Sequence, residues 1–158
     1  MAQTTTAMSQ ANFEVEVSTD GTSWTSIAGQ ATTVSLSGGE QKIGSQHTAD
    51  GEQAVVVGAN KVEPITVTVK TLYTETSAEA WKVVKARYDG TAKTIYLRYS
   101  PGGGDTGDLR YTCAIGGAAA LVPIVSCLPP DMDAGAEDLA MFEFAVMAPG
   151  LLEATISS

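Results

Sequence analysis

Short stretches in which apolar and polar residues alternate recur along most of this chain, and they limit the possible folds more than any other feature of the sequence. Residues 13–17, 65–69, 95–99 and 142–146 each show the two-residue period of a half-buried β-strand. With the turn signals between such stretches, the pattern predicts about eight or nine strands. We therefore expect a mainly β fold, a β-sandwich or open barrel with one helix packed outside it.

The length of the chain fits a single domain. Its 158 residues are 44% hydrophobic, which is enough to build a core. Residues 1–12 are rich in Thr, Gln, Ala and Ser and show no periodicity. We expect a flexible arm at residues 1–12, followed by one β domain at residues 13–158.

One stretch breaks the alternation and predicts a helix over residues 77–89. Thr76 and Glu79 have the spacing of a capping box, and Gly90 is placed to end the helix in a left-handed conformation. Trp81, Val84 and Tyr88 fall on one helical face. This face is expected to pack on the sheet, because a single short amphipathic helix is not stable in water by itself.

The turn signals predict two hairpins. Asp20-Gly21 is typical of a two-residue turn between strands. The polar, Gly-rich residues 38–53 are too long for an ordinary connection in a compact domain, which makes them the first candidate for a binding element. We expect their flanks, residues 34–36 and 54–57, to pair and to project the loop as a long hairpin.

The charge of the chain argues against binding to nucleic acid. It has 18 acidic and 9 basic residues, and from Tyr111 onward it has six acidic residues and no Lys or Arg. Cys113 and Cys127 match no metal or redox spacing and are expected to be buried thiols. No secretory signal and no apolar run of about 18 residues is found, so we expect no membrane contact and synthesis in the cytoplasm.

Catalytic patterns are missing. His47, the only histidine, has no neighbouring Cys, and Ser45 does not lie in a G-x-S-x-G turn. The Gly-rich residues 101–107 lack the Lys-Ser or Lys-Thr of a phosphate loop. We expect neither an enzyme nor a cofactor.

One acidic segment has two interpretations. Its carboxylates are of the type that Ca²⁺ prefers, but Gly135 and Phe142 stand where an EF-hand loop places ligands. A structural Ca²⁺ site and a solvated acidic loop both remain open for this segment, whose acidic residues are Asp131, Asp133, Glu137 and Asp138.

The order of these features resembles a known family. The matching pieces are F-E-V-E-V-S-T-D-G-T-S-W-T-S-I-A-G at the start, the long polar loop, V-E-P-I-T-V-T-V-K, the helix with Trp81, and P-P-D-M-D-A-G-A-E-D followed by F-E-F. The chain is similar to the major tail tube proteins of long-tailed, non-contractile (siphovirus-type) bacteriophages. The resemblance implies a β-sandwich with a flanking helix, six subunits in a ring, and rings stacked into a tube through which the genome leaves.

The resemblance also implies roles for particular residues. The lumen wall is expected from residues 32–37, 54–58, 119–128 and 139–147. Six copies of a chain with formal charge −9 give a ring a charge of about −54, so DNA is expected to pass an acidic lumen without binding. Lumen candidates are Glu137, Asp138 and Glu143, and candidates for the ring-to-ring contact are Gly38, Gly39, Glu40, Gln41, Lys42, Ile43, Gly44, Ser45, Gln46, His47, Asp50 and Glu52.

The implied partners are further copies of the chain and the tape measure, tail terminator and tail-tip proteins, in a virion assembled in the host bacterium. Two alternatives stay open. One is an immunoglobulin-like or carbohydrate-binding β-sandwich that uses Trp24 with Tyr96 or Tyr111. The other is a tube protein of a contractile tail or secretion machine, which shares the fold and differs in its partners.

Overall fold

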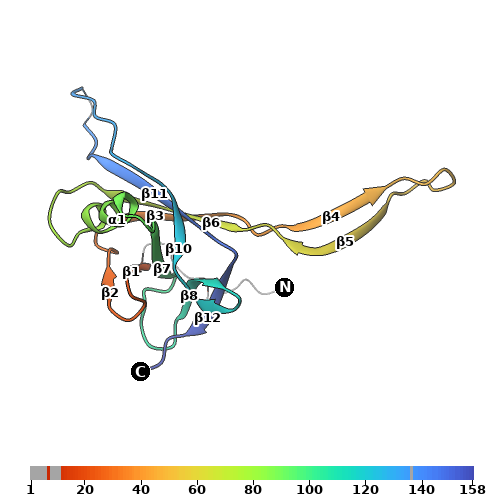
Figure 1. Ribbon diagram of the computed structural model, residues 1–158, viewed down its shortest axis with the longest axis horizontal. Helices are drawn as coiled ribbons and strands as arrows, with labels where there is room; N and C mark the ends of the chain where they lie inside the picture. Colours follow the sequence, from red (N-terminus) through yellow and green to blue (C-terminus); the bar gives the residue numbers. More distant parts are fainter. Residues whose placement is uncertain (1–6, 8–11, 136) are drawn as a thin grey trace.

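A computed structural model describes residue 7, residues 12–135 and residues 137–158. In this part the chain is mainly β with one helix, as predicted (Figure 1). Nearly all of the predicted arm lies outside the described residues. The elements are β1 (Glu14–Ser18), β2 (Trp24–Ser26), β3 (Ala31–Gly38), β4 (Gln41–Gln46), β5 (Val55–Val62), β6 (Ile65–Leu72), α1 (Ala80–Asp89), β7 (Thr94–Ser100), β8 (Leu109–Ile115), β9 (Ala118–Ala119), β10 (Val122–Leu128), β11 (Met141–Ala148) and β12 (Gly150–Thr155).

Ten strands form one antiparallel sheet in the order β12-β8-β7-β10-β11-β6-β3, with β1 and β2 attached through β7 and β9 paired to β8. Strand β10 joins two parts of this sheet. Residues 122–123 pair with β7, whereas residues 124–128 pair with β11, with a register shift between Ile124 and Ser126. The change of partner begins beside Pro123, because proline cannot donate a ladder hydrogen bond.

The core lies between these two parts of the sheet. Val15 and Leu97 come from the β1–β7 part, Val69 and Phe144 come from the β6–β11 part, and all four belong to one hydrophobic cluster. Each of these side chains is at most 1% exposed. The two parts therefore pack as the layers of a sandwich that β10 connects.

Helix α1 covers this core beside β7 and β10. Trp81 and Val84 are buried in the cluster, and Tyr88 packs against it. The Trp81 ring meets Phe142 edge to face, with ring centroids 5.1 Å apart. The helical face named from the sequence is thus the face turned to the sheet.

The helix ends at Asp89, as predicted, but its predicted start and the predicted conformation of Gly90 are wrong. It begins at Ala80, and the N-cap residue Glu79 makes no side-chain capping bond. Glu79 instead accepts a hydrogen bond from the Thr74 hydroxyl, and the Ala80 N–H donates to Oε1 of Gln30 at 3.0 Å. A side chain fifty residues away in the chain satisfies this helix start. Gly90 has φ −69° and ψ 171°, so it ends the helix in an extended and not a left-handed conformation.

The predicted two-residue turn at Asp20-Gly21 is also wrong, because a loop of residues 19–23 joins β1 to β2. Gly21 has a positive φ of 77°, and Asp20 does not. The backbone N–H groups of Ser23 and Thr22 each donate to Oδ1 of Asp20 at 2.8 Å. These bonds hold the pKa of Asp20 well below its usual range. Asp20 therefore organises a wider loop in place of a tight turn.

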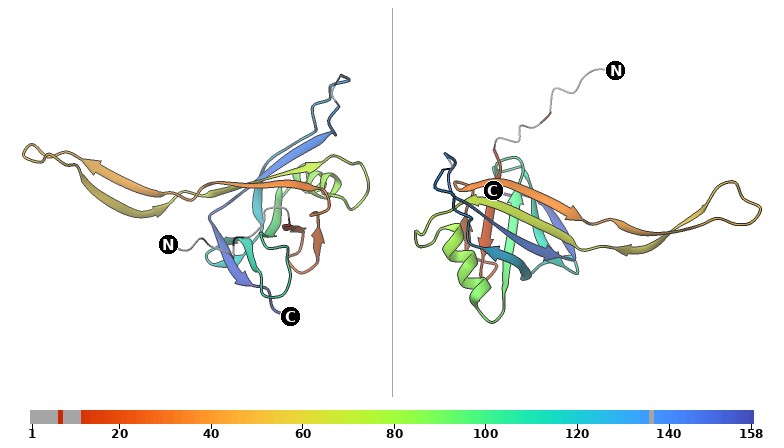
Figure 2. Two further views of the ribbon diagram at one scale, coloured as in Figure 1. Left: turned by 180° about the vertical axis from the view of Figure 1, so that it is seen from behind. Right: turned by 90° about the horizontal axis from the view of Figure 1, so that it is seen from above.

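The long hairpin is present, but its pairing differs from the prediction. Residues 34–36 pair with β6, as in Val34 with Val69, and residues 55–57 pair with β4. The predicted pairing of residues 34–36 with residues 54–57 is therefore wrong. The β3–β6 pair stays in the main sheet, and the β4–β5 pair forms a separate two-stranded sheet that projects from it (Figure 2).

Candidate assembly surface

The β4–β5 hairpin projects from one end of the molecule, and every residue of its two strands is exposed. Most of the residues predicted to make the ring-to-ring contact lie in β4 or in the loop that follows it. In that loop, His47, Asp50 and Glu52 are exposed at the hairpin tip. An isolated two-stranded hairpin is marginally stable in water, so this element needs another surface to cover it.

Both faces of the hairpin carry uncovered apolar side chains. The register pairs Val56 with Ser45 and Val57 with Gly44, and side chains alternate between the faces along each strand. Ile43 and Val56 therefore lie on one face and Val55 and Val57 on the other. The four side chains are 53–62% exposed. A hairpin that is apolar on both faces fits a position between two other surfaces.

The sequence prediction named mainly polar residues of this hairpin and did not include its exposed valines. The sequence did contain a signal for an apolar hairpin surface, because Val55, Val56 and Val57 are consecutive and therefore lie on both faces of the strand. A strand with one buried and one solvated face carries apolar side chains on the buried face alone. Val62, at the base of the hairpin, was not included either and is 61% exposed.

The base of the hairpin is held in a fixed geometry. Gly38 has φ 83°, and a Cβ added there would lie 2.1 Å from the Pro64 carbonyl oxygen, so only glycine fits. The Glu63 N–H donates to the Glu40 carbonyl at 3.0 Å. Lys42 Nζ lies 2.8 Å from Glu63 Oε1 across the two strands. These contacts set the direction in which the hairpin leaves the sheet.

The predicted lumen strands are only partly brought together. Residues 32–37, 119–128 and 139–147 fall largely on β3, β10 and β11, which share one part of the sheet. Residues 54–58 instead lie in the projecting hairpin, so their placement beside these strands is wrong. Strand β6 separates β3 from β11, and the sequence prediction did not include it.

The outward face of β10-β11-β6-β3 carries one of the predicted lumen carboxylates. Glu143 on β11 lies across from Leu128 on one side and from Lys70 on the other, and all three side chains are exposed. A lysine therefore stands opposite the only lumen candidate that belongs to a strand. The other two, Glu137 and Asp138, are exposed in the segment between β10 and β11.

This segment and the strand ends beside it form an apolar rim, which we define as Leu128, Met132, Leu139 and Met141. Leu128, Met132 and Leu139 are 68%, 78% and 72% exposed, more than any other large hydrophobic side chain in the described part of the chain. A groove of about 220 Å³ at the rim is lined in part by Leu128, Pro129 and Met141. The segment that carries the rim projects from the body in a different direction from the β4–β5 hairpin (Figures 1 and 2).

The acidic residues of the same segment do not form a metal site. No group of three or more His, Cys, Asp or Glu side chains with metal-binding geometry occurs among the described residues, which include all four carboxylates considered for Ca²⁺. Asp133 Oδ1 accepts the Gly135 N–H at 2.9 Å instead. Asp131, Asp133, Glu137 and Asp138 are exposed.

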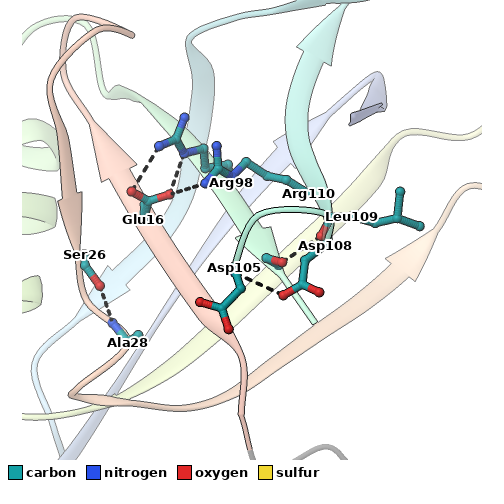
Figure 3. A network of polar contacts seen from close by, with 9 residues as sticks. Glu16, Ser26, Ala28, Arg98, Asp105, Asp108, Leu109 and Arg110 are labelled. Atoms are coloured by element: carbon teal, nitrogen blue, oxygen red, sulfur yellow. Dashed lines mark hydrogen bonds and ion pairs between the residues drawn. The ribbon is translucent and has the colours of Figure 1, made fainter. Parts of the chain in front are cut away.

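The aromatic residues considered for carbohydrate binding are occupied by protein contacts. The Arg98 guanidinium lies 3.9 Å from the centre of the Trp24 ring, and Tyr96 meets that ring edge to face. Arg98 also holds Glu16 through two hydrogen bonds, of 2.6 Å and 3.0 Å, and Arg110 lies 3.8 Å from the same carboxylate (Figure 3). Arg98 thus covers a face of the Trp24 ring on which a sugar would stack.

Tyr111 is engaged too, because it stacks on Tyr99 with ring centroids 5.5 Å apart. The two cysteines are buried and free. Burial raises the pKa of Cys113 to about 12 and that of Cys127 to about 11. Both thiols therefore stay protonated near neutral pH, which removes their nucleophilic form. In the described part of the chain no helix has the length and apolarity to cross a membrane.

No protein-family model matches the sequence, and no curated protein matches it. Solved structures do resemble this chain. A chain in the sheath/tube terminator of PVC, an extracellular contractile injection system, in its extended state is 14% identical over 94% of this chain and 97% of that chain, with a TM-score of 0.67. A chain in the tube-terminating cap of the anti-feeding prophage is 14% identical over 99% and 96%, with a TM-score of 0.61.

A chain in the tail of an empty GTA particle, described with C6 symmetry, is 12% identical over 96% of this chain and all of that chain, with a TM-score of 0.59. At these identities the likeness defines the fold alone. The chain has a tail-tube-like fold, as expected from the sequence. The similar structures come from contractile injection systems and a GTA tail, so the fold does not single out non-contractile phages.

Proposed function

We propose that this chain is the structural subunit of a tail tube in a phage or phage-like particle, and that its rings stack through the β4–β5 hairpin. The observation that carries the proposal is a hairpin exposed along its whole length with apolar side chains on both faces. A monomer gains nothing from such an element, whereas an assembly covers it. The fold likeness to chains of tube, cap and tail assemblies, over nearly the full length, supports the same role.

Of the tube types considered, the contractile injection systems receive more support than the non-contractile tail. The PVC and anti-feeding prophage structures belong to injection systems, and one of them is a sheath-tube complex. We therefore propose a tube in a contractile or GTA-like particle. Its partners are further copies of the chain in hexameric rings, with terminator, tape measure and tail-tip proteins at the ends and along the lumen.

The lumen wall in this proposal is the outward face of β10-β11-β6-β3. Two open edges support it: β3 ends the sheet, and residues 124–128 of β10 have lost β7 as a neighbour. Open edges of this kind pair with another chain, which closes a ring into a continuous barrel. Lys70 opposite Glu143 offsets charge on the strands, so the negative potential that repels DNA arises chiefly from Glu137 and Asp138.

Electron microscopy of the purified protein at rising concentration tests the proposal. The matched variant replaces residues 41–62 with Asn-Gly, which removes the hairpin and leaves the separate β3–β6 pairing in place. Leu109→Ser, at an exposed position on β8, serves as the control. We expect hollow tubes from the wild type and the control, and single rings or monomers from the shortened variant.

Tubes formed by the shortened variant would remove the hairpin from the stacking contact. A wild-type protein that never polymerises, even with tail-tip components present, would reject the tube subunit itself. A glycan screen would then test the carbohydrate-binding alternative at Trp24.

A further inference from the structure

The most exposed apolar side chains of the described residues fall into two clusters. The first is the rim, Leu128, Met132, Leu139 and Met141, of which the first three are at least 68% exposed. The second is on the hairpin, where Val56, Val57, Ile43 and Val62 are 61–62% exposed. The segment that carries the rim and the hairpin project from the body in different directions in every view (Figures 1 and 2).

Two different apolar surfaces at separate places on one chain suit a head-to-tail contact. A surface that pairs with itself closes a dimer and ends growth, whereas a surface that pairs with a different surface of the next copy leaves one of each free for further addition. Both surfaces are apolar, and neither is covered within the chain. Each is therefore a suitable partner for the other.

The two surfaces differ in charge, because the hairpin base carries Lys42 and Lys61 together with Glu40 and Glu63, whereas the rim carries acidic residues only. Asp131, Asp133, Glu137 and Asp138 surround the rim, and no Lys or Arg occurs anywhere after Tyr111. The base of the hairpin carries Lys61, which makes no ion pair among the described residues, next to Val62. Rim against rim would bring carboxylates together, while rim against hairpin base brings them to a lysine.

We propose that the rim of one copy docks on the β4–β5 hairpin of a second copy in the neighbouring ring, with the acidic segment toward Lys61. The inference rests on the proposed tube function and names the acceptor that the hairpin requires. It also gives the acidic segment an assembly role in addition to its effect on the lumen potential.

A mixing experiment tests this pairing. The rim variant carries Leu128→Asp and Leu139→Asp, and the hairpin variant carries Val56→Asp and Val57→Asp. All four side chains are exposed in the chain, so the melting temperatures should match that of the wild type. Leu109→Asp, at an exposed position on β8, is the control.

Each variant alone is expected to need at least about tenfold more protein to form tubes, because a buried carboxylate faces an apolar partner. Mixed together, the two variants still hold one intact hairpin and one intact rim. They should form complexes of two stacked units that grow no further, detected by mass photometry and electron microscopy.

Three results would overturn the inference. A rim variant that forms tubes at the wild-type concentration would show that the hairpin docks elsewhere and would leave the tube proposal standing. Two variants that fail alone and do not associate when mixed would point to hairpin meeting hairpin or rim meeting rim. A wild-type protein that forms no tubes at all would remove the tube proposal and this inference with it.

Discussion

Gly44 on β4 offers a substitution with opposite expected effects on folding and on assembly. A Cβ added there meets only the Val57 carbonyl oxygen, at 3.9 Å, and the φ of Gly44 is not positive. Gly44→Val therefore fits the single chain, and it replaces a residue that weakens strands by about 0.5–1 kcal/mol relative to alanine. The hairpin should become slightly more ordered in the isolated subunit.

In a tube the same change fills space beside Val57 on a face that the neighbouring copy covers. Adding carbon atoms to a packed surface costs about 1–3 kcal/mol, and each 1.4 kcal/mol is a factor of about ten in an equilibrium constant. We therefore expect the protein concentration at which tubes appear to rise by about 5- to 150-fold.

The concentration at which tubes appear is measured by sedimentation and light scattering, and folding is measured by thermal unfolding of the dilute protein. Gly29→Ala is the matched control, because Gly29 is exposed in a turn and no atom lies within 4 Å of an added Cβ. Both the control and Gly44→Val should unfold at or above the wild-type temperature. Tube formation by Gly44→Val at the wild-type concentration would refute the packed face.

Three further predictions concern the fold. Phe144→Ala should lower the free energy of unfolding by about 3–5 kcal/mol in urea titrations, because this fully buried ring stacks on its neighbour in the core. Burial raises the folded-state pKa values of Cys113 and Cys127 from 9.0 to about 12 and about 11. The melting temperature should therefore be unaffected by these thiols below pH 9 and should fall as the pH rises from 9 toward 12. The melting temperature of a double Cys→Ala variant should fall less over that range. Arg98→Lys should cost about 1–3 kcal/mol, since lysine cannot make both bonds to Glu16, and an unchanged urea midpoint would contradict this.

Sequence periodicity determined the strand content and the apolar helical face, because these depend on side chains two, three or four residues apart. Val67, Val69, Trp81 and Val84 are buried as that periodicity requires. The long hairpin was also foreseeable, since residues 38–53 are too polar and too long for an ordinary connection.

Pairing and termini depended on residues far apart in the chain. Strand β3 pairs with β6 and not with residues 54–57: Leu36 lies opposite Val67, and at the end of the pair only glycine fits at position 38, beside the Pro64 carbonyl. The helix starts at Ala80 because Gln30 supplies the acceptor. A local sequence pattern cannot reveal partners such as Val67 or Gln30, which lie far away in the chain.

The candidate assembly surface shows the same division. The segment named from the sequence lies in the exposed hairpin, but alternation could not tell which apolar residues find a neighbour within the chain. Val55 and Val57 are apolar like the core valines, yet they stay exposed because β5 pairs only with β4, outside the main sheet. The sequence thus determined which residues are apolar and share a face, whereas only the tertiary structure decided which faces remain uncovered, because burial depends on segments that meet through folding.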